Sequence, residues 1–180
     1  MSFDLKNAAD FLQTRAVPLS RIVTELDAKI VLAESCTGGL VSALVSMIPG
    51  ISNYHCGSFA TYRPLSKRKW LGVQDSIIYK HTCESEQMAR EMAYCALKRT
   101  PEANYSAAVV GHLGPNAPVN DGCYWIGMAN RHTMDSAKPH LTHSYTGVCK
   151  EETRVARQFE IAFRMLEIFT EHLEQHGVRK

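Results

Sequence analysis

The stretch Ala33-Glu34-Ser35-Cys36-Thr37-Gly38-Gly39 decides the fold of this chain. It lies between an apolar run at residues 30–32 and a helix-like run at residues 40–48. A buried strand that ends in small polar residues and glycines, and then turns into a helix, brings backbone N–H groups and hydroxyls to one point. Such a turn suits a phosphate, a carboxylate or the oxyanion of a reacting amide.

Strand-like and helix-like segments alternate on both sides of this turn. The pattern predicts strands at residues 30–33, 54–62, 105–110, 123–129 and 141–145, and helices at 4–15, 18–28, 37–47, 64–71, 85–99 and 151–175. This alternation predicts an α/β fold with a mostly parallel sheet, in one domain over residues 1–180. Ligands bind beyond the carboxyl ends of parallel strands, so the loops after 30–33 and 105–110 should form one site.

Composition argues against several classes of partner. The 180 residues include 20 Lys or Arg and 18 Asp or Glu, so the net charge of +2 gives no electrostatic case for nucleic acid or a membrane surface. We find no apolar run near the roughly 20 residues of a membrane span, and no signal-like N-terminus, so a cytoplasmic protein is expected. The six cysteines form no C-x-x-C motif, and the eight histidines show no spacing typical of metal ligands. Neither a metal nor another cofactor is therefore predicted.

Six motifs follow one another in an order typical of a known family. They are Ala33 to Gly39, Ile48-Pro49-Gly50, Tyr62 with Lys67 five residues later, Leu71-Gly72-Val73, Glu91-Met92-Ala93 and Gly111-x-x-Gly114-Pro115. Together they resemble the CinA C-terminal domain family over about residues 10–170. The resemblance implies a three-layer α/β/α sandwich, often a homodimer, that cleaves the carboxamide of nicotinamide mononucleotide to nicotinate mononucleotide and ammonia. It also implies that the additional N-terminal domain of larger members is not part of this sequence.

The resemblance assigns roles to individual residues. Ser35 matches the nucleophile, Lys67 the general base, and Tyr62 a tyrosine that orients the amine or relays a proton, a variant of triad chemistry. The N–H groups of residues 36–38 would face the oxyanion. The expected substrate-binding residues are Thr37, Gly38, Gly39, Gly111, Gly114, Lys150 and Arg154.

Structural interpretations compete with these roles. Ser35 and Thr37 could cap the helix, and the two glycines could allow tight packing of strand and helix. Lys67 could belong to a solvated helix face. Cys36 is a rival nucleophile, because helix N-termini lower the pKa of a thiol.

The sequence also departs from the family pattern. The family's Gly-Asp-Arg motif is replaced by Gly147-Val148-Cys149-Lys150, and the later family arginine could align with Arg154 or Arg157. The segments 62–67, 82–85 and 111–118 are altered as well. These changes leave an alternative open: a catalytically silent or substrate-shifted member that binds a nucleotide or a protein partner.

Overall fold

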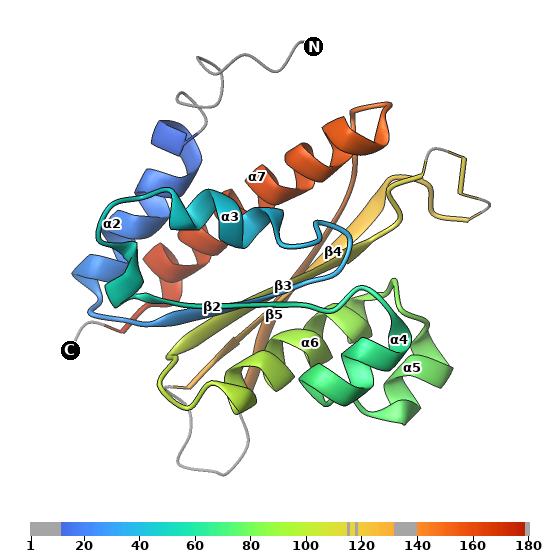
Figure 1. The fold of residues 1–180 in the computed structure, drawn as a ribbon, viewed down its shortest axis with the longest axis horizontal. Coiled ribbons are helices and arrows are strands. Elements are labelled where there is room, and N and C mark those ends of the chain that lie inside the picture. Colours follow the sequence, from blue (N-terminus) through green and yellow to red (C-terminus); the bar gives the residue numbers. More distant parts are fainter. Residues whose placement is uncertain (1–11, 115, 118, 132–139, 179–180) are drawn as a thin grey trace.

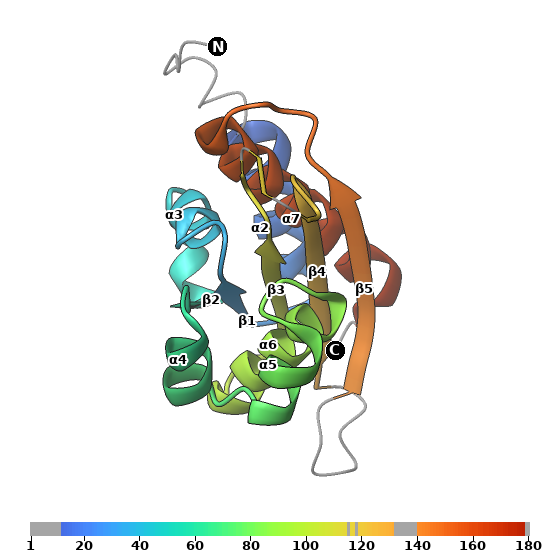
Figure 2. The same cartoon turned by 90° about the vertical axis from the view of Figure 1, so that its right-hand side faces the viewer.

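The protein is a five-stranded sheet between two layers of helices (Figures 1 and 2). The computed structural model describes residues 12–114, 116–117, 119–131 and 140–178. The expected α/β/α sandwich is thereby confirmed. Most of the helix predicted at residues 4–15 lies outside the described residues.

The sheet contains β1 (Ile30–Glu34), β2 (His55–Ala60), β3 (Tyr105–Gly111), β4 (Cys123–Asn130) and β5 (His140–Val148), in the order β2-β1-β3-β4-β5. Strand β1 is parallel to β2 and β3, whereas β4 is antiparallel to both β3 and β5. Among these strands, all but β4 therefore run in one direction. The sheet is mixed but mostly parallel, as the sequence predicted.

The helical segments divide between the two faces of the sheet (Figure 2). One face carries η1 (Leu12–Ala16), α2 (Val17–Glu25), α3 (Leu40–Ser46) and α7 (Arg154–His176), with η2 (Ile51–Asn53) nearby. The other carries α4 (Pro64–Ser66), η3 (Lys67–Leu71), α5 (Asp75–His81) and α6 (Glu86–Arg99). Helix α5 was not predicted, because two apolar residues in one short segment give no clear helical period.

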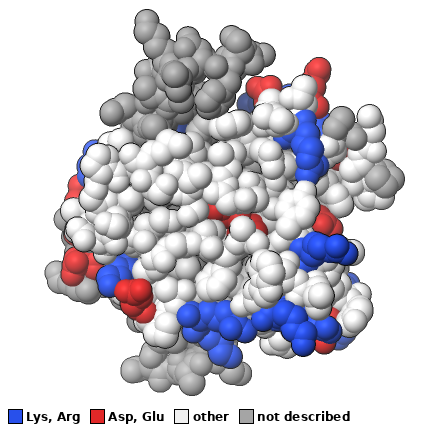
Figure 3. Space-filling view, viewed as in Figure 1, with Lys and Arg blue, Asp and Glu red and all other residues white. Residues whose placement is uncertain are grey.

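Side chains along β1 point alternately to the two faces of the sheet, and each face has its own hydrophobic core. Ile30 and Leu32 pack against α2 and α7, whereas Val31 and Ala33 pack against α6. Because both faces of the strand are covered, its sequence is continuously apolar until Glu34. In the space-filling view, mostly uncharged surface lies over α2 and α3, and Lys and Arg gather towards the lower and right-hand margins (Figure 3).

The carboxyl ends of β1, β2, β3 and β5 lie at one edge of the sheet, on the right in Figure 1. Backbone bonds join the loops there: the Ser35 N–H donates to the carbonyl of Val109, and the Thr61 N–H to that of Glu34. The start of α7 reaches the same edge, where the Gln158 amide donates to the carbonyl of Cys36 at 3.1 Å. Among the described helices, none has the length and apolar character needed to cross a membrane.

Candidate active site

The buried carboxylate of Glu34 organises the turn between β1 and α3. It accepts five hydrogen bonds of 2.8 to 3.0 Å, from the hydroxyls of Thr37 and Ser58 and the backbone N–H groups of Gly39, Val41 and Ser42. The carboxylate thus occupies the positive N-terminus of α3. We expected these N–H groups to be open to a substrate anion, and that expectation was wrong for the first turn of the helix.

Two glycines give the turn its shape. Gly38 and Gly39 have φ angles of +64° and +105°, which side chains other than glycine rarely adopt, so the helix begins at Leu40 rather than at residue 37. A Cβ atom on either glycine would meet nothing within 4 Å. The tight-packing interpretation is therefore wrong: backbone conformation requires these glycines, and the space above them is open to a ligand.

Ser35 and Lys67 meet at the start of this turn. The Lys67 Nζ lies 2.7 Å from the Ser35 Oγ, although the two residues are 32 positions apart in sequence. Lys67 is fully buried and Ser35 is 6% exposed, so the solvated-helix interpretation of Lys67 is wrong. The same Nζ donates to the carbonyl of Thr61 at 2.8 Å. Thr61 was not predicted to take part in the site.

Burial also sets the chemistry of the amine. Desolvation lowers the pKa of Lys67, and it is opposed by the charges of Cys83, Glu84 and Cys36, which raise it. A neutral amine can donate to the Thr61 carbonyl and direct its lone pair at the hydroxyl of Ser35. That arrangement allows Lys67 to take the proton of Ser35.

The rival nucleophile Cys36 is poorly suited to attack. Its side chain is 4% exposed, and burial raises the pKa of the thiol to about 12. The thiol is therefore protonated at neutral pH, and thiolate is the reactive form of cysteine. The backbone around Cys36 is better suited to catalysis. Among the described residues, the N–H groups of Cys36 and Thr37 donate to no backbone carbonyl, whereas that of Gly38 donates to the carbonyl of Ser35.

Tyr62 and Arg154 form the rim of the site. Arg154 donates to the Tyr62 hydroxyl at 2.5 Å and to the Gly114 carbonyl at 3.4 Å. Tyr62 is 56% exposed. The Tyr62 hydroxyl thus contacts Arg154. The amine of Lys67 is oriented instead by the carbonyl of Thr61.

Arg157 has a different environment from Arg154. It donates to Asp121 at 3.0 Å and to the carbonyls of Leu113 and Glu151, and this pairing lowers the pKa of Asp121. A Cβ on Gly114 would lie 1.9 Å from the Asp121 carboxylate, so glycine is required for this ion pair. Arg157 therefore fixes the loop after β3, whereas Arg154 contacts Tyr62 and Gly114. A role of Arg154 in substrate binding stays a prediction.

The remaining predicted residues lie farther out or serve packing. The Thr37 hydroxyl donates to the carboxylate of Glu34, so Thr37 supports the turn, but it does not cap α3, whose N-cap is Gly39. Gly111 lies in β3, where a Cβ would come within 2.8 Å of the Cys123 carbonyl. Lys150 is exposed, and its backbone N–H is held by the carboxylate of Glu160 at 2.9 Å. Their direct contact with a substrate stays a prediction.

Sequence reasoning missed the roles of Glu34 and Gln158. The one available signal was an acidic residue directly after an apolar strand, where a buried carboxylate needs several donors.

Comparisons with known proteins agree with this architecture. The family model described as CinA C-terminal domain matches residues 13–166. A CinA-like protein of Amoebophilus asiaticus is 33% identical over 129 residues, 70% of this chain and 31% of that protein. A CinA-like protein of Endomicrobium trichonymphae is 32% identical over 148 residues, 79% of this chain and 34% of that protein. The chain thus spans about a third of the length of these relatives.

Solved structures show the same fold. The competence/damage inducible protein CihA from Agrobacterium tumefaciens superposes with a TM-score of 0.77 at 26% identity, covering 89% of this chain and 94% of that one. The competence damage-inducible protein A from Klebsiella pneumoniae gives a TM-score of 0.79 at 20% identity, covering 88% and 94%.

Replacing Glu34 by Gln should destabilise the protein by roughly 2–4 kcal/mol, because an amide presents one acceptor oxygen to five donors and buries a mismatched NH₂ group. Chemical denaturation measures this change. Glu152→Gln, at an exposed glutamate, is the matched control and should stay near the wild type. If the Glu34→Gln protein were as stable as that control, the Glu34 carboxylate would not be stabilising the turn.

Replacing Lys67 by Met should raise the free energy of unfolding at pH 7. The pKa of Lys67 is lowered by folding, so between that value and 10.5 the unfolded chain binds a proton that the folded chain lacks. This extra proton makes the wild type less stable as the pH falls from 10.5 to the lowered pKa of Lys67. Above pH 10.5 the destabilisation disappears. The advantage of Lys67→Met should therefore shrink as pH approaches 10.5.

Denaturation curves at several pH values, with Lys69→Met as the exposed control, measure this difference. Parallel pH profiles for Lys67→Met and the wild type would show that burial does not perturb the amine.

Proposed function

The chain belongs to the CinA C-terminal domain family, and we propose that it is an amidohydrolase that converts nicotinamide mononucleotide to nicotinate mononucleotide and ammonia. The observation that carries this proposal is the 2.7 Å contact between the Ser35 hydroxyl and the buried Lys67 amine. It lies beside the open space above Gly38 and Gly39. A serine becomes a useful nucleophile only when a neighbouring base removes its proton, and a desolvated lysine is such a base.

The reaction begins with attack of the Ser35 Oγ on the carboxamide carbon while Lys67 takes the hydroxyl proton. The carbonyl oxygen becomes an oxyanion, for which the N–H groups of Cys36 and Thr37 are the available donors. Collapse of this intermediate transfers the proton to the leaving nitrogen and releases ammonia. Water, deprotonated by Lys67, then attacks the acyl-enzyme and releases the carboxylic acid with Ser35 regenerated.

Recognition of the nucleotide is proposed to rest on Arg154. Its guanidinium lies at the rim of the site, at the first residue of α7, beside the Tyr62 hydroxyl. Guanidinium groups bind phosphate through paired hydrogen bonds, and the N-terminus of a 23-residue helix adds partial positive charge. Lys150 supplies a second cation near the start of α7, in place of the arginine of the Gly-Asp-Arg motif.

The alternative is a member that binds a nucleotide without hydrolysing it. The observation that favours it is the replacement of Gly-Asp-Arg by Gly147-Val148-Cys149-Lys150. The charge of Glu84 also opposes the fall in the pKa of Lys67. Binding and turnover must therefore be measured separately. The cytoplasmic location remains a proposal from the sequence, and the homodimer remains a proposal that rests on the family resemblance.

We expect the wild-type protein to release ammonia from nicotinamide mononucleotide and Ser35→Ala to lose at least about 10³-fold in kcat, because removing a nucleophile abolishes the acyl-enzyme route. Lys67→Met should lose a comparable factor. A coupled ammonia assay and chromatography of the product measure this. Calorimetry that shows binding by the wild type without turnover would favour the silent alternative, and equal turnover by Ser35→Ala would reject the mechanism.

Replacing Arg154 by Gln should raise KM for the nucleotide about tenfold, which corresponds to about 1.4 kcal/mol, and leave kcat nearly unchanged. The reason is that the lost charge contacts phosphate rather than the reacting amide. Nicotinamide riboside, which lacks the phosphate, should show no such change. Arg21→Gln on α2 is the exposed control. An equal loss with both substrates would contradict phosphate recognition by Arg154.

A further inference from the structure

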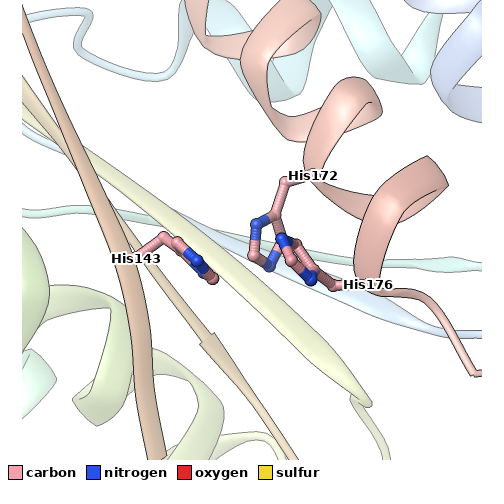
Figure 4. A group of neighbouring side chains, drawn as sticks. All are labelled: His143, His172 and His176. Carbon is pink, nitrogen blue, oxygen red and sulfur yellow. The ribbon is translucent and has the colours of Figure 1, made fainter.

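Three histidines meet at the opposite end of the molecule from Ser35. His143 lies on β5, and His172 and His176 lie on α7 (Figure 4). One nitrogen of each ring lies within 4.8 Å of one nitrogen of the other two. The ring centroids are 4.6 to 4.9 Å apart, and the rings of His143 and His176 are stacked. We call these residues the three-histidine cluster.

Secondary structure places the three rings together. His172 and His176 are four residues apart, so they project from the same side of α7. His143 is two residues before Tyr145, which packs against the core beneath α7, and alternate residues of a strand share a face. The cluster went unrecognised in the sequence because its third member lies 29 residues before the helical pair, on a different element.

The cluster lies far from the Ser35–Lys67 pair along the helix. Gln158, near the start of α7, contacts the Cys36 carbonyl, whereas His176 ends the helix 18 residues later. At 1.5 Å per residue this separation is about 27 Å. The cluster therefore takes no part in the proposed amide hydrolysis.

The buried member of the cluster, His172, has a ring nitrogen without a hydrogen-bond partner among the described residues. His172 is 1% exposed, and the unpartnered atom is its buried Nδ1. An unpartnered polar atom in a core is unfavourable unless something compensates it.

We propose that the three-histidine cluster binds a divalent transition-metal ion of the zinc class, with water as the fourth ligand. Imidazole nitrogens suit Zn²⁺, Cu²⁺, Ni²⁺ and Co²⁺, and three nitrogens with an open position fit tetrahedral Zn²⁺. Zn–N distances of about 2.0–2.1 Å require the nitrogens to approach to about 3.4 Å. Because His143 and His176 are exposed, their rings can rotate inward while the buried His172 stays in place.

The role of such an ion would be structural. It would link the last turn of α7 to β5, the strand at one edge of the sheet. An ion that binds only the folded state stabilises it by mass action. This inference does not depend on the proposed hydrolase activity, and its test uses no activity measurement.

The experiment titrates the full chain, without a histidine tag, with Co²⁺ as a spectroscopic probe and then with Zn²⁺. We expect visible ligand-field absorption of tetrahedral Co²⁺ that saturates at one equivalent and disappears when Zn²⁺ displaces Co²⁺. Thermal unfolding should show a higher Tm with Zn²⁺ than after treatment with a chelator. Competition with a chromophoric chelator gives the affinity.

Variants at the two exposed histidines avoid disturbing the core. His143→Ala and His176→Ala should each weaken Zn²⁺ binding at least about tenfold, and the double variant should lose the Tm shift. His81→Ala, on α5 across the sheet, is the matched control and should bind as the wild type does. Absence of a one-equivalent Co²⁺ spectrum, or wild-type affinity in the double variant, would overturn the proposal.

Discussion

The carboxylate of Glu34 is the constraint on which the rest of the site depends. A buried charge at the end of a strand needs donors on all sides, and this one obtains them from the turn, from the first turn of α3 and from β2. Because the Glu34 carboxylate binds all of these segments, it fixes the position of the neighbouring Ser35. It also neutralises the positive N-terminus of α3, so that a substrate anion must be held by other groups.

Lys67 shows the cost of the proposed chemistry. Its amine is enclosed between a hydroxyl and a carbonyl, with no carboxylate bonded to it among the described contacts. That environment disfavours the charged form and lowers the pKa of the amine, yet it offers less to stability than an apolar side chain of similar size. Function and stability thus pull in different directions at one residue.

Sequence was sufficient for the layers, the strands and the pairing of Ser35 with Lys67, because local periodicity and an ordered set of motifs carry that information. It did not reveal that the helix terminus is filled by Glu34, or that Thr61 rather than Tyr62 contacts the amine. Those facts depend on side-chain directions in three dimensions. The different contacts of Arg154 and Arg157, with Tyr62 and with Asp121 respectively, are of the same kind. The three-histidine cluster also required the fold, since β5 and α7 are adjacent only in space.

The open backbone above Gly38 and Gly39 has a consequence for how such a protein diversifies. Ser35 and Lys67, the proposed reacting groups, belong to the segment from β1 to η3, as does Tyr62, whereas Gly114 and Arg154 belong to the loop after β3 and to the start of α7. The proposed dyad and the part of the rim formed by Gly114 and Arg154 are thus encoded in separate parts of the chain. In the proposed mechanism, substrate selectivity can therefore change through the loop after β3 and the start of α7 while Ser35 and Lys67 stay the same, and residues 111–118 are among those where this sequence leaves the family pattern.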